Sequence, residues 1–417
     1  MAYNLLIVFL LVFSFPVPLF GNSIALSILL SAGMLLKNGQ LREAGKLAFS
    51  PYAFAVWTGT LLLAYYAFFY SFVRGTFDFA RVRILFSMLL GCVACILAYT
   101  SLKGKRDDTD YMPRLIVYVF VIQSIIEMAA FVSPACAGIV KRFQFESDMA
   151  LAEEAYSGFR GLAISGRLYF EFAVTYGVVI ILQMKRMVDA GRVSFLHSGE
   201  LLLLVIGGFF AGRTVFAGLL FALLLLLLAR VSVRMKMAFI VRTAIGIGAL
   251  AALCVILLPG EITGFIQTIL LPWVFDLFIK YQETGTATTS FSFNTLNEMY
   301  RVEITPTEWL IGSGHYYNPD GTYYKHVDAG YLRHILYWGL LGSALNFLYA
   351  CRFFYRPFKR LSKGAYNDRL FLAILFAYTL MVHYKGDILG ASRFYYIVVI
   401  LYLFHFIHIK KPIKQTA

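Results

Sequence analysis

The stretch IGSGHYYNPDGTYYKHVDAGYLRHILYWGLLG, Ile311–Gly342, runs from a polar loop rich in Gly and Tyr directly into an apolar segment. Asp328 stands where the polar part gives way to the apolar part. A helix crosses a bilayer with about 20 mostly apolar residues, so the stretch predicts a loop that leads into a membrane span.

The rest of the chain has the composition of a membrane protein with many spans. Of its 417 residues, 60% are hydrophobic and 14% are charged, and the mean hydropathy is +0.72. Soluble domains have roughly 45–50% apolar and about 25% charged residues, which argues against a soluble fold. We therefore predict an all-α polytopic protein in which residues 1–417 form a single integral membrane domain.

About twelve apolar segments approach spanning length. No basic region precedes the first one, so it is expected to be a span and not a cleaved signal peptide. The run 195–229 is too long for one span, and its GGFFAGRT motif predicts a hairpin whose turn carries Arg213. The expected spans are 4–20, 22–36, 51–73, 84–101, 114–133, 168–184, 195–211, 214–229, 239–258, 329–350, 369–384 and 392–408.

Basic residues gather on one side of this topology. Most of the 37 Lys and Arg lie in KNGQLREAGK, KGKRDDTDYMPR, MKRMVDAGR, ARVSVRMK, RFFYRPFKRLSKG and the C-terminal tail. Lys and Arg are enriched in cytoplasmic loops, so both termini are expected in the cytoplasm. The net charge of +14 is thereby explained by topology, and nucleic acid is not an expected partner.

Two large loops, 134–167 and 259–328, fall on the opposite, outer side. Within the second, 264–280 is apolar but contains Gln267, Pro272 and Asp276. A span there would place a basic loop outside, so we predict an interfacial or re-entrant helix. Small inner loops and large outer loops indicate a protein that works at its outer face.

Three outer arginines are candidate phosphate ligands, because a guanidinium presents a planar fork of donors that matches phosphate oxygens. Arg160 and Arg167 lie in the Gly-rich SGFRGLAISGR, where backbone N–H groups can approach an anion closely. Arg213 lies at the tight turn of the hairpin, near membrane depth, where a charge is costly and often functional.

Other outer cations leave two interpretations open. Arg301, in NEMYRVEITPTEW, either binds phosphate or pairs with Glu298 or Glu303. For the group Arg74, Arg81 and Arg83, neutralisation by phospholipid headgroups is the favoured interpretation.

Asp328 is the candidate general base. An Asp at a helix start is a good N-cap. A carboxylate desolvated at the membrane boundary also has a raised pKa and can take a proton from a sugar hydroxyl. The two roles are compatible, and His315 and His326 are alternative bases. The tyrosines of this region either stack on sugars or form an interfacial aromatic belt; they are Tyr316, Tyr317, Tyr323, Tyr324 and Tyr331.

No metal or nucleotide motif is expected. Cys92 and Cys95 lie in an apolar run without a second pair. The DDTD at 107–110 sits in a short basic cytoplasmic loop and is expected to be solvated. The GSG at 312–314 lacks a dinucleotide-binding context and predicts a turn that brings His315 and the tyrosines round.

Taken together, the pattern resembles the Wzy-type O-antigen polymerase family, within the superfamily that includes the O-antigen ligases. The resemblance rests on the dozen spans, FRGLAISGR before the sixth span, the GRTVFAGLL hairpin, the Ile311–Gly342 stretch and the closing HYKGDILGASRFYY. Relatives show G-x-G, a polar loop, His-Asn-x-Tyr-Leu and a Gly-x-x-Gly span. Here Asp328 and Ala329 replace the His-Asn; Tyr331, Leu332, Gly339 and Gly342 match. The Asp form, with Lys385 and Asp387 in the closing motif, looks more like a polymerase than a ligase.

The resemblance implies a GT-C-like architecture in the bacterial inner membrane, with the active site facing the periplasm. It implies a glycosyltransferase of O-antigen or capsule-type polysaccharide biosynthesis. A growing chain on undecaprenyl pyrophosphate would be transferred to a new lipid-linked repeat unit, by inversion and without metal or cofactor. Asp328 would be the base. The pyrophosphate and substrate contacts would be Arg160, Arg167, Arg213, Arg301, Tyr331 and Lys385.

The expected partners are the two lipid-linked substrates and membrane lipids, with a chain-length-regulating co-polymerase as a further candidate. Two alternatives stay open: a ligase that moves polymer to lipid A-core, and a transporter of lipid-linked oligosaccharides. A transporter would place charges in an inner cavity reachable from both sides, and the predicted spans carry few.

Overall fold

The computed structural model describes all residues except 103–107, 146–159, 258, 273–278, 280, 283–284, 286–291, 363 and 409–417. The described part is helical, and its only β-type pairing is an isolated bridge between Tyr317 and Tyr323. The α-helices are α1 Ala2–Phe13, α2 Ser23–Lys37, α3 Leu41–Ala48, α4 Pro51–Val73, α5 Ala80–Ser101, α6 Tyr111–Val132, α7 Pro134–Lys141, α9 Phe170–Ala190, α10 Phe195–Ala211, α11 Val215–Leu228, α12 Val233–Leu257, α13 Gly260–Phe265, α15 Ser292–Met299, α16 Pro306–Ile311, α17 Gly330–Arg360, α18 Tyr366–Lys385 and α19 Arg393–His408.

Among the described residues, four helices are long and apolar enough to cross a membrane. They are α4, α5, α6 and the part of α12 from Val233 to Leu253. Five more are apolar but shorter, namely α1, α2, α10, α11 and α19. The prediction of an all-helical protein with membrane-length helices is therefore confirmed.

Each of the twelve predicted segments falls largely on a helix, and α4 and α10 match their segments residue for residue. The predicted end of the first segment, 4–20, is wrong. Helix α1 ends at Phe13, Ser14 takes a left-handed conformation (φ 48°), and Pro16 and Pro18 follow. Proline excludes the preceding residue from helical conformation and lacks a backbone donor, so the apolar run continues without a helix.

Four further helices were not predicted as such. Helix α3 lies in the first basic connection, α7 in the predicted outer loop 134–167, α15 in the predicted outer loop 259–328, and α16 just before the Gly-rich loop. Of the predicted interfacial helix 264–280, the structure describes α13 and a π-helical continuation, Ile266–Leu270. Residues 273–278 and 280 of that prediction lie outside the described residues.

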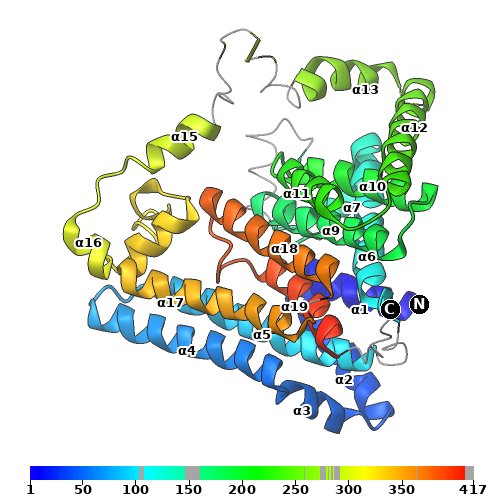
Figure 1. Cartoon of the computed structure of the whole chain (residues 1–417). Coiled ribbons are helices and arrows are strands. Elements are labelled where there is room, and N and C mark those ends of the chain that lie inside the picture. Colours follow the sequence, from blue (N-terminus) through cyan, green and yellow to red (C-terminus); the bar gives the residue numbers. More distant parts are fainter. Residues whose placement is uncertain are drawn as a thin grey trace.

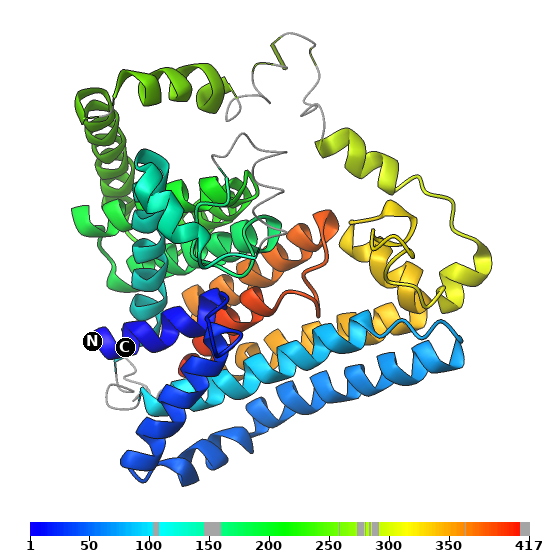
Figure 2. The same cartoon turned by 180° about the vertical axis from the view of Figure 1, so that it is seen from behind.

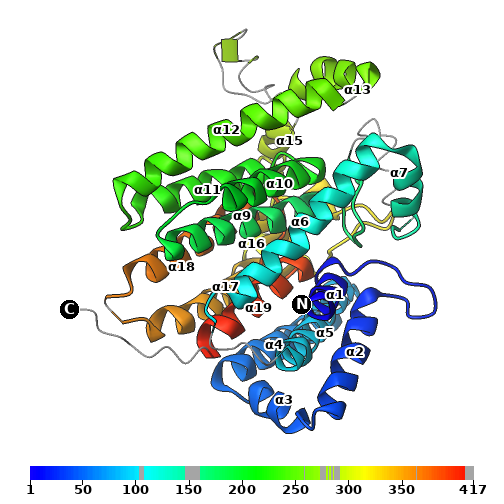
Figure 3. The same cartoon turned by 90° about the vertical axis from the view of Figure 1, so that its right-hand side faces the viewer.

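Helix α9 is the centre of the packing. It contacts α6, α10, α11, α18 and α19, and its residues 172–188 are all buried. Helix α12 packs on α10 at one edge of the molecule (Figure 3). Helices α17 and α18 lie on the other side, where α17 contacts α4 (Figures 1 and 2).

Helix α17 is broken at Gly339, which has φ 65°. The loop before it fills the break, because the N–H groups of Ser313 and Gly314 donate to the carbonyls of Leu336 and Tyr337 at 2.7 and 3.1 Å. A Cβ on Gly339 would lie 2.3 Å from the Leu310 carbonyl oxygen. Only glycine accepts both the positive φ and this approach. The first arm of α17 thereby becomes a short half-helix that carries the site.

Three loops meet at this end of the bundle, which we call the loop end: residues 74–79, 312–328 and 386–392. Arg74 donates to the Gly312 carbonyl at 3.0 Å. The Asp78 carboxylate accepts the Tyr316 backbone N–H at 2.6 Å. The Gly-rich turn at 312–314 therefore brings the loop tyrosines round, as predicted, and the α4–α5 hairpin anchors them.

Candidate active site

A buried ion cluster lies beneath the loop end. The Arg81 guanidinium, from the first turn of α5, donates to the Asp387 carboxylate at 2.6 Å. The Tyr316 hydroxyl donates to the same carboxylate at 3.1 Å. The side chains of Arg81 and Asp387 are only 1% and 2% exposed. Burial alone would raise the pKa of Asp387, but Arg81 and His334 hold it well below its usual value.

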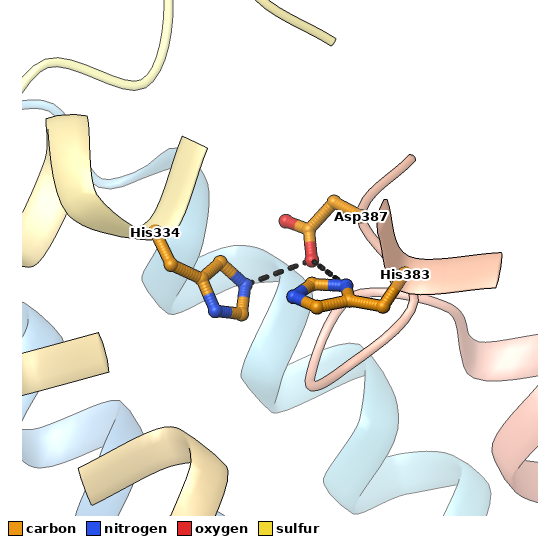
Figure 4. Close-up of side chains that lie close together, drawn as sticks. All are labelled: His334, His383 and Asp387. Atoms are coloured by element: carbon orange, nitrogen blue, oxygen red, sulfur yellow. Dashed lines mark hydrogen bonds and ion pairs between the residues drawn. The ribbon is translucent and has the colours of Figure 1, made fainter. Parts of the chain in front are cut away.

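His334 joins the cluster between Asp387 and Asn346. Its Nε2 lies 2.8 Å from Asp387 Oδ1 (Figure 4), and its Nδ1 lies 3.2 Å from the Asn346 amide nitrogen. The amide nitrogen is a donor, and it also donates to the Leu389 carbonyl at 3.0 Å. The Arg81 Nη2, which is also a donor, lies 2.9 Å from Nε2, so donors face both ring nitrogens and these contacts do not assign the tautomer.

His383 is the third residue of the group, but its acceptor nitrogen binds backbone N–H groups and not Asp387. Its Nδ1 accepts the backbone N–H groups of Ile388 and Leu389 at 3.1 and 3.3 Å, and it lies 3.9 Å from Asp387 (Figure 4). His383 thus caps the turn that follows α18. That turn is what carries Asp387 to the cluster.

The donor set of this cluster does not fit a metal ion. His334, His383 and Asp387 place one ligand atom each within 4.8 Å of one another. A metal needs unprotonated ring nitrogens directed at it. Here the Arg81 guanidinium lies 2.9 Å from His334 Nε2, and His383 Nδ1 is engaged by two N–H groups. The Arg81 guanidinium supplies the positive charge that the carboxylate requires.

The expectation for Arg81 is therefore wrong. It is neutralised by Asp387, 306 residues away in sequence, and not by phospholipid headgroups. The predicted span began at residue 84, whereas α5 begins at Ala80 and draws Arg81 into the bundle. Arg83 is exposed, as the headgroup interpretation requires, whereas Arg74 donates to a backbone carbonyl.

Asp328 lies just above this cluster and faces Arg333. Its Oδ1 is 3.7 Å from Arg333 Nη1, and its side chain is 51% exposed. It is not the N-cap of α17, since that position is Ala329 and no side chain caps the helix. Partial burial raises the pKa of Asp328, and the positive charge of Arg333 acts in the opposite direction. The predicted N-cap role is therefore wrong, and the role as general base stays a prediction.

Arg333 is held in an aromatic cage. Its guanidinium carbon lies 3.6 Å from the ring centroid of Tyr323 and 4.1 Å from that of Tyr316. Stacking of this kind stabilises a desolvated cation. The tyrosines thus have a role within the protein that neither predicted alternative covered.

Two predicted arginines and Asp328 lie near Lys385, and the three predicted cations come from three different segments. Lys385 donates from the end of α18 to the Thr214 hydroxyl at 3.2 Å. Arg160 donates to the Ala211 carbonyl at 2.5 Å, so both reach the 211–214 turn that carries Arg213. Lys385 lies one residue beyond the predicted span 369–384. Its pKa is lowered by burial and by the positive charges of Arg213 and Arg160, while Asp328 raises it.

The other predicted residues stand further out. Arg167 is exposed beside Glu171, with which it interacts electrostatically. Arg301 is exposed, and among the described residues it forms no ion pair with Glu298 or Glu303.

Tyr331, the last of the predicted substrate contacts, packs its ring on His383 with 4.6 Å between the ring centroids. Its hydroxyl donates to the Leu380 carbonyl.

The two alternative bases are also apart from the cluster. His315 and His326 are both exposed, and His315 stacks on Tyr324 with centroids 5.5 Å apart. Neither is among the groups whose charge acts on Asp328, which are Arg333, Asp387 and Lys385. Both histidines therefore lie apart from the buried ion cluster, and the choice among the three candidate bases stays a prediction.

Four residues of the site were not selected from the sequence, namely Arg81, Arg333, His334 and His383. A signal for three of them existed. Arg333 and His334 fall inside the predicted span 329–350, and His383 inside 369–384. An ionisable side chain within a span is costly and marks a functional candidate.

Comparisons with known proteins add no identification, since no family model, curated protein or solved structure matches the chain significantly.

Proposed function

We propose that this protein polymerises a lipid-linked glycan at the outer face of the bacterial inner membrane. In this proposal the chain crosses the membrane twelve times in a GT-C-like arrangement, with the loop end in the periplasm. The opposite end then carries the basic connections, in keeping with the preference of Lys and Arg for the cytoplasm. The membrane-length helices support this placement.

The observation that carries the proposal is the convergence of Asp328 with Lys385, Arg213 and Arg160. Burial and, after it, the charges of Arg213 and Arg160 lower the pKa of Lys385, and an anion bound beside these cations would offset both effects. A pyrophosphate supplies that anion, and its negative charge grows as the bond to the sugar breaks. Undecaprenyl pyrophosphate carrying the growing chain is the proposed donor.

Asp328 is the proposed general base. The acceptor is a repeat unit on the same lipid, and its hydroxyl oxygen attacks the anomeric carbon of the donor. The bond from that carbon to the pyrophosphate oxygen breaks, and undecaprenyl pyrophosphate leaves. The hydroxyl proton passes to Asp328, which is half-exposed and therefore reachable by a substrate. One displacement inverts the anomeric centre, and the pyrophosphate linkage supplies the driving force.

A gel of surface polysaccharide tests the proposal. A strain without this gene is expected to show a band of one repeat unit and no ladder, since polymerisation is lost while export and ligation continue. Full-length protein supplied in trans should restore the ladder. Polymer that accumulates on the carrier lipid at the outer face would indicate a ligase instead. Repeat units trapped on the cytoplasmic side would indicate a transporter.

A further inference from the structure

A chain of contacts links the buried ion cluster to the proposed base. Arg81 holds one oxygen of Asp387, and the Tyr316 hydroxyl binds the same oxygen at 3.1 Å. The ring of Tyr316 packs on the guanidinium of Arg333, whose Nη1 lies 3.7 Å from Asp328. Asp387 and Asp328 are thus connected through Tyr316 and Arg333, although they do not touch.

Arg333 depends on this chain for its position. The residue is 7% exposed, and its Nη2 is a buried nitrogen without a hydrogen-bond partner among the described residues. An ion pair at 3.7 Å is long, so hydrogen bonds alone do not fix the guanidinium. The two aromatic faces do, and of these Tyr316 is fully buried and tied to Asp387. Burial and the nearby Asp387 charge raise the pKa of Tyr316 well above its usual value, so its hydroxyl remains a donor.

We propose that Asp387 and Tyr316 are positioning residues that hold the Arg333 guanidinium against Asp328 and so keep that base ionised. The inference rests on the proposed function, because it assigns Asp328 the role of base. A base that is partly desolvated takes up a proton too early unless a cation faces it. Neither Asp387 nor Tyr316 need touch the substrate.

The charged and titratable groups around Asp328 set the sign of the effect. Arg333 on its own helix and Lys385 at the end of α18 favour the carboxylate; Asp387 and the Tyr323 phenol oppose it. If Arg333 moves away, Asp328 retains its proton to a higher pH. The acid limb of the pH–activity profile then shifts upward.

The test compares Tyr316→Phe with Tyr396→Phe in full-length protein. The first removes the hydroxyl that binds Asp387 and keeps the ring over Arg333. The second removes a different buried hydroxyl, which accepts the Gly390 N–H at 3.2 Å in the same 386–392 segment. In Tyr316→Phe we expect the acid limb of kcat/KM for lipid-linked repeat units to move up by about one pH unit. Tyr396→Phe should leave it in place. An unchanged acid limb in Tyr316→Phe would overturn the proposal.

A second measurement needs no glycan assay. In the Asp328→Cys variant, peptide mass spectrometry follows how fast iodoacetamide alkylates the new thiol at a series of pH values. Arg333 should lower the pKa of this thiol, and adding Tyr316→Phe should raise it again by about the same one unit. Equal thiol pKa values in both backgrounds would contradict the positioning role. A shifted thiol pKa, together with a wild-type protein that makes no ladder from lipid-linked repeat units, would retain the positioning role but remove the polymerase proposal.

Discussion

Cations at the two ends of the helical bundle have different charged neighbours. At the end opposite the loop end, Lys185 faces Asp189 and Asp368, the latter at 2.8 Å. Arg186 faces Asp110 at 2.7 Å and Glu200 at 3.3 Å. At the loop end, Lys385 faces two further cations, Arg213 and Arg160. Lys185 and Arg186 are each matched by two carboxylates, whereas the charged neighbours of Lys385 are two arginines and one carboxylate, Asp328.

We infer from this difference that the first group stabilises the fold, whereas the group around Lys385 is suited to bind an anion. The opposite end also borders a cavity of about 700 Å³, yet Lys185 and Arg186 within its lining are already paired. A cavity alone therefore does not locate the chemistry. Crowded like charges are unfavourable unless a ligand of opposite charge binds between them, and the loop end has that arrangement.

The largest expected effect comes from the proposed base. Asp328→Asn keeps the shape of the side chain and removes its basicity, so turnover should fall by about 10²- to 10⁴-fold. Polymer ladders and initial rates with lipid-linked repeat units measure the loss. Asp320→Asn is the matched control, since Asp320 is exposed in the same loop and binds only Thr322 and its own backbone. A full ladder from Asp328→Asn would remove the base role.

At the opposite end the expected effect is on stability. Lys185 is 3% exposed, so Lys185→Met removes a buried cation that pairs with both Asp189 and Asp368. Breaking a buried pair in this way costs about 3 kcal/mol. Thermal unfolding in detergent should show a clearly lowered Tm, while kcat/KM of the folded protein stays near wild type. Lys359→Met, on an exposed residue, is the control. Strong loss of catalysis with unchanged Tm would reverse the roles of the two ends.

Removing Lys385 at the loop end is expected to weaken substrate binding without lowering the Tm. Lys385→Met eliminates one phosphate contact and is expected to raise KM for the lipid pyrophosphate substrate about tenfold, which corresponds to about 1.4 kcal/mol. The Tm should not fall, because Arg213 and Arg160 lose a repulsive neighbour. Inorganic pyrophosphate should raise the Tm of the wild type more than that of the variant. If the wild type and Lys385→Met have the same KM and the same rise in Tm with pyrophosphate, there is no anion site at Lys385.

The smallest expected effect concerns a compensated pair within the loop end itself. Glu308 caps α16 and binds Lys325 at 2.9 Å. Burial opposes ionisation, but hydrogen bonds from Thr305 and Lys325 lower the pKa of Glu308 from 4.5 to about 2. A depressed pKa stabilises the folded loop above pH 4.5, and this contribution is lost as the pH falls toward 2. Glu308→Gln should destabilise the loop by about 1 kcal/mol.

Limited proteolysis of the 300–328 region against pH checks this prediction. Wild-type loop cleavage should increase between pH 4.5 and 2, and Glu308→Gln should be cleaved faster at neutral pH with kcat nearly unchanged. Thr307→Ala in the same helix is the control. Cleavage that does not depend on Glu308 would show that the cap does not order the loop.

The helices were predictable because a bilayer-length apolar run has few alternatives to a helix. The residues at which the helices end were harder to predict. Pro16 and Pro18 end α1 within an apolar run, and the break at Gly339 depends on a loop that docks on it from outside the helix. A hydropathy pattern counts apolar residues, so it does not show where prolines end a helix or where a loop docks on one.

Part of the candidate site was predictable for a chemical reason. Asp328, Arg160, Arg213 and Lys385 are polar residues next to apolar runs, and the structure brings them together. The Arg81–Asp387 pair was missed because its members lie 306 residues apart and no local pattern connects them. His315 and His326 were attractive as bases by residue type alone, but both face solvent.

The central claim is that the loop end transfers a glycan between two lipid pyrophosphates. Purified full-length protein in liposomes, supplied with lipid-linked repeat units and no nucleotide sugar, tests it most directly. The account predicts a ladder of carrier-linked oligomers, with one undecaprenyl pyrophosphate released for each repeat unit added, and the loss of both with Asp328→Asn. Unchanged single repeat units, or a ladder that Asp328→Asn makes equally well, would contradict it.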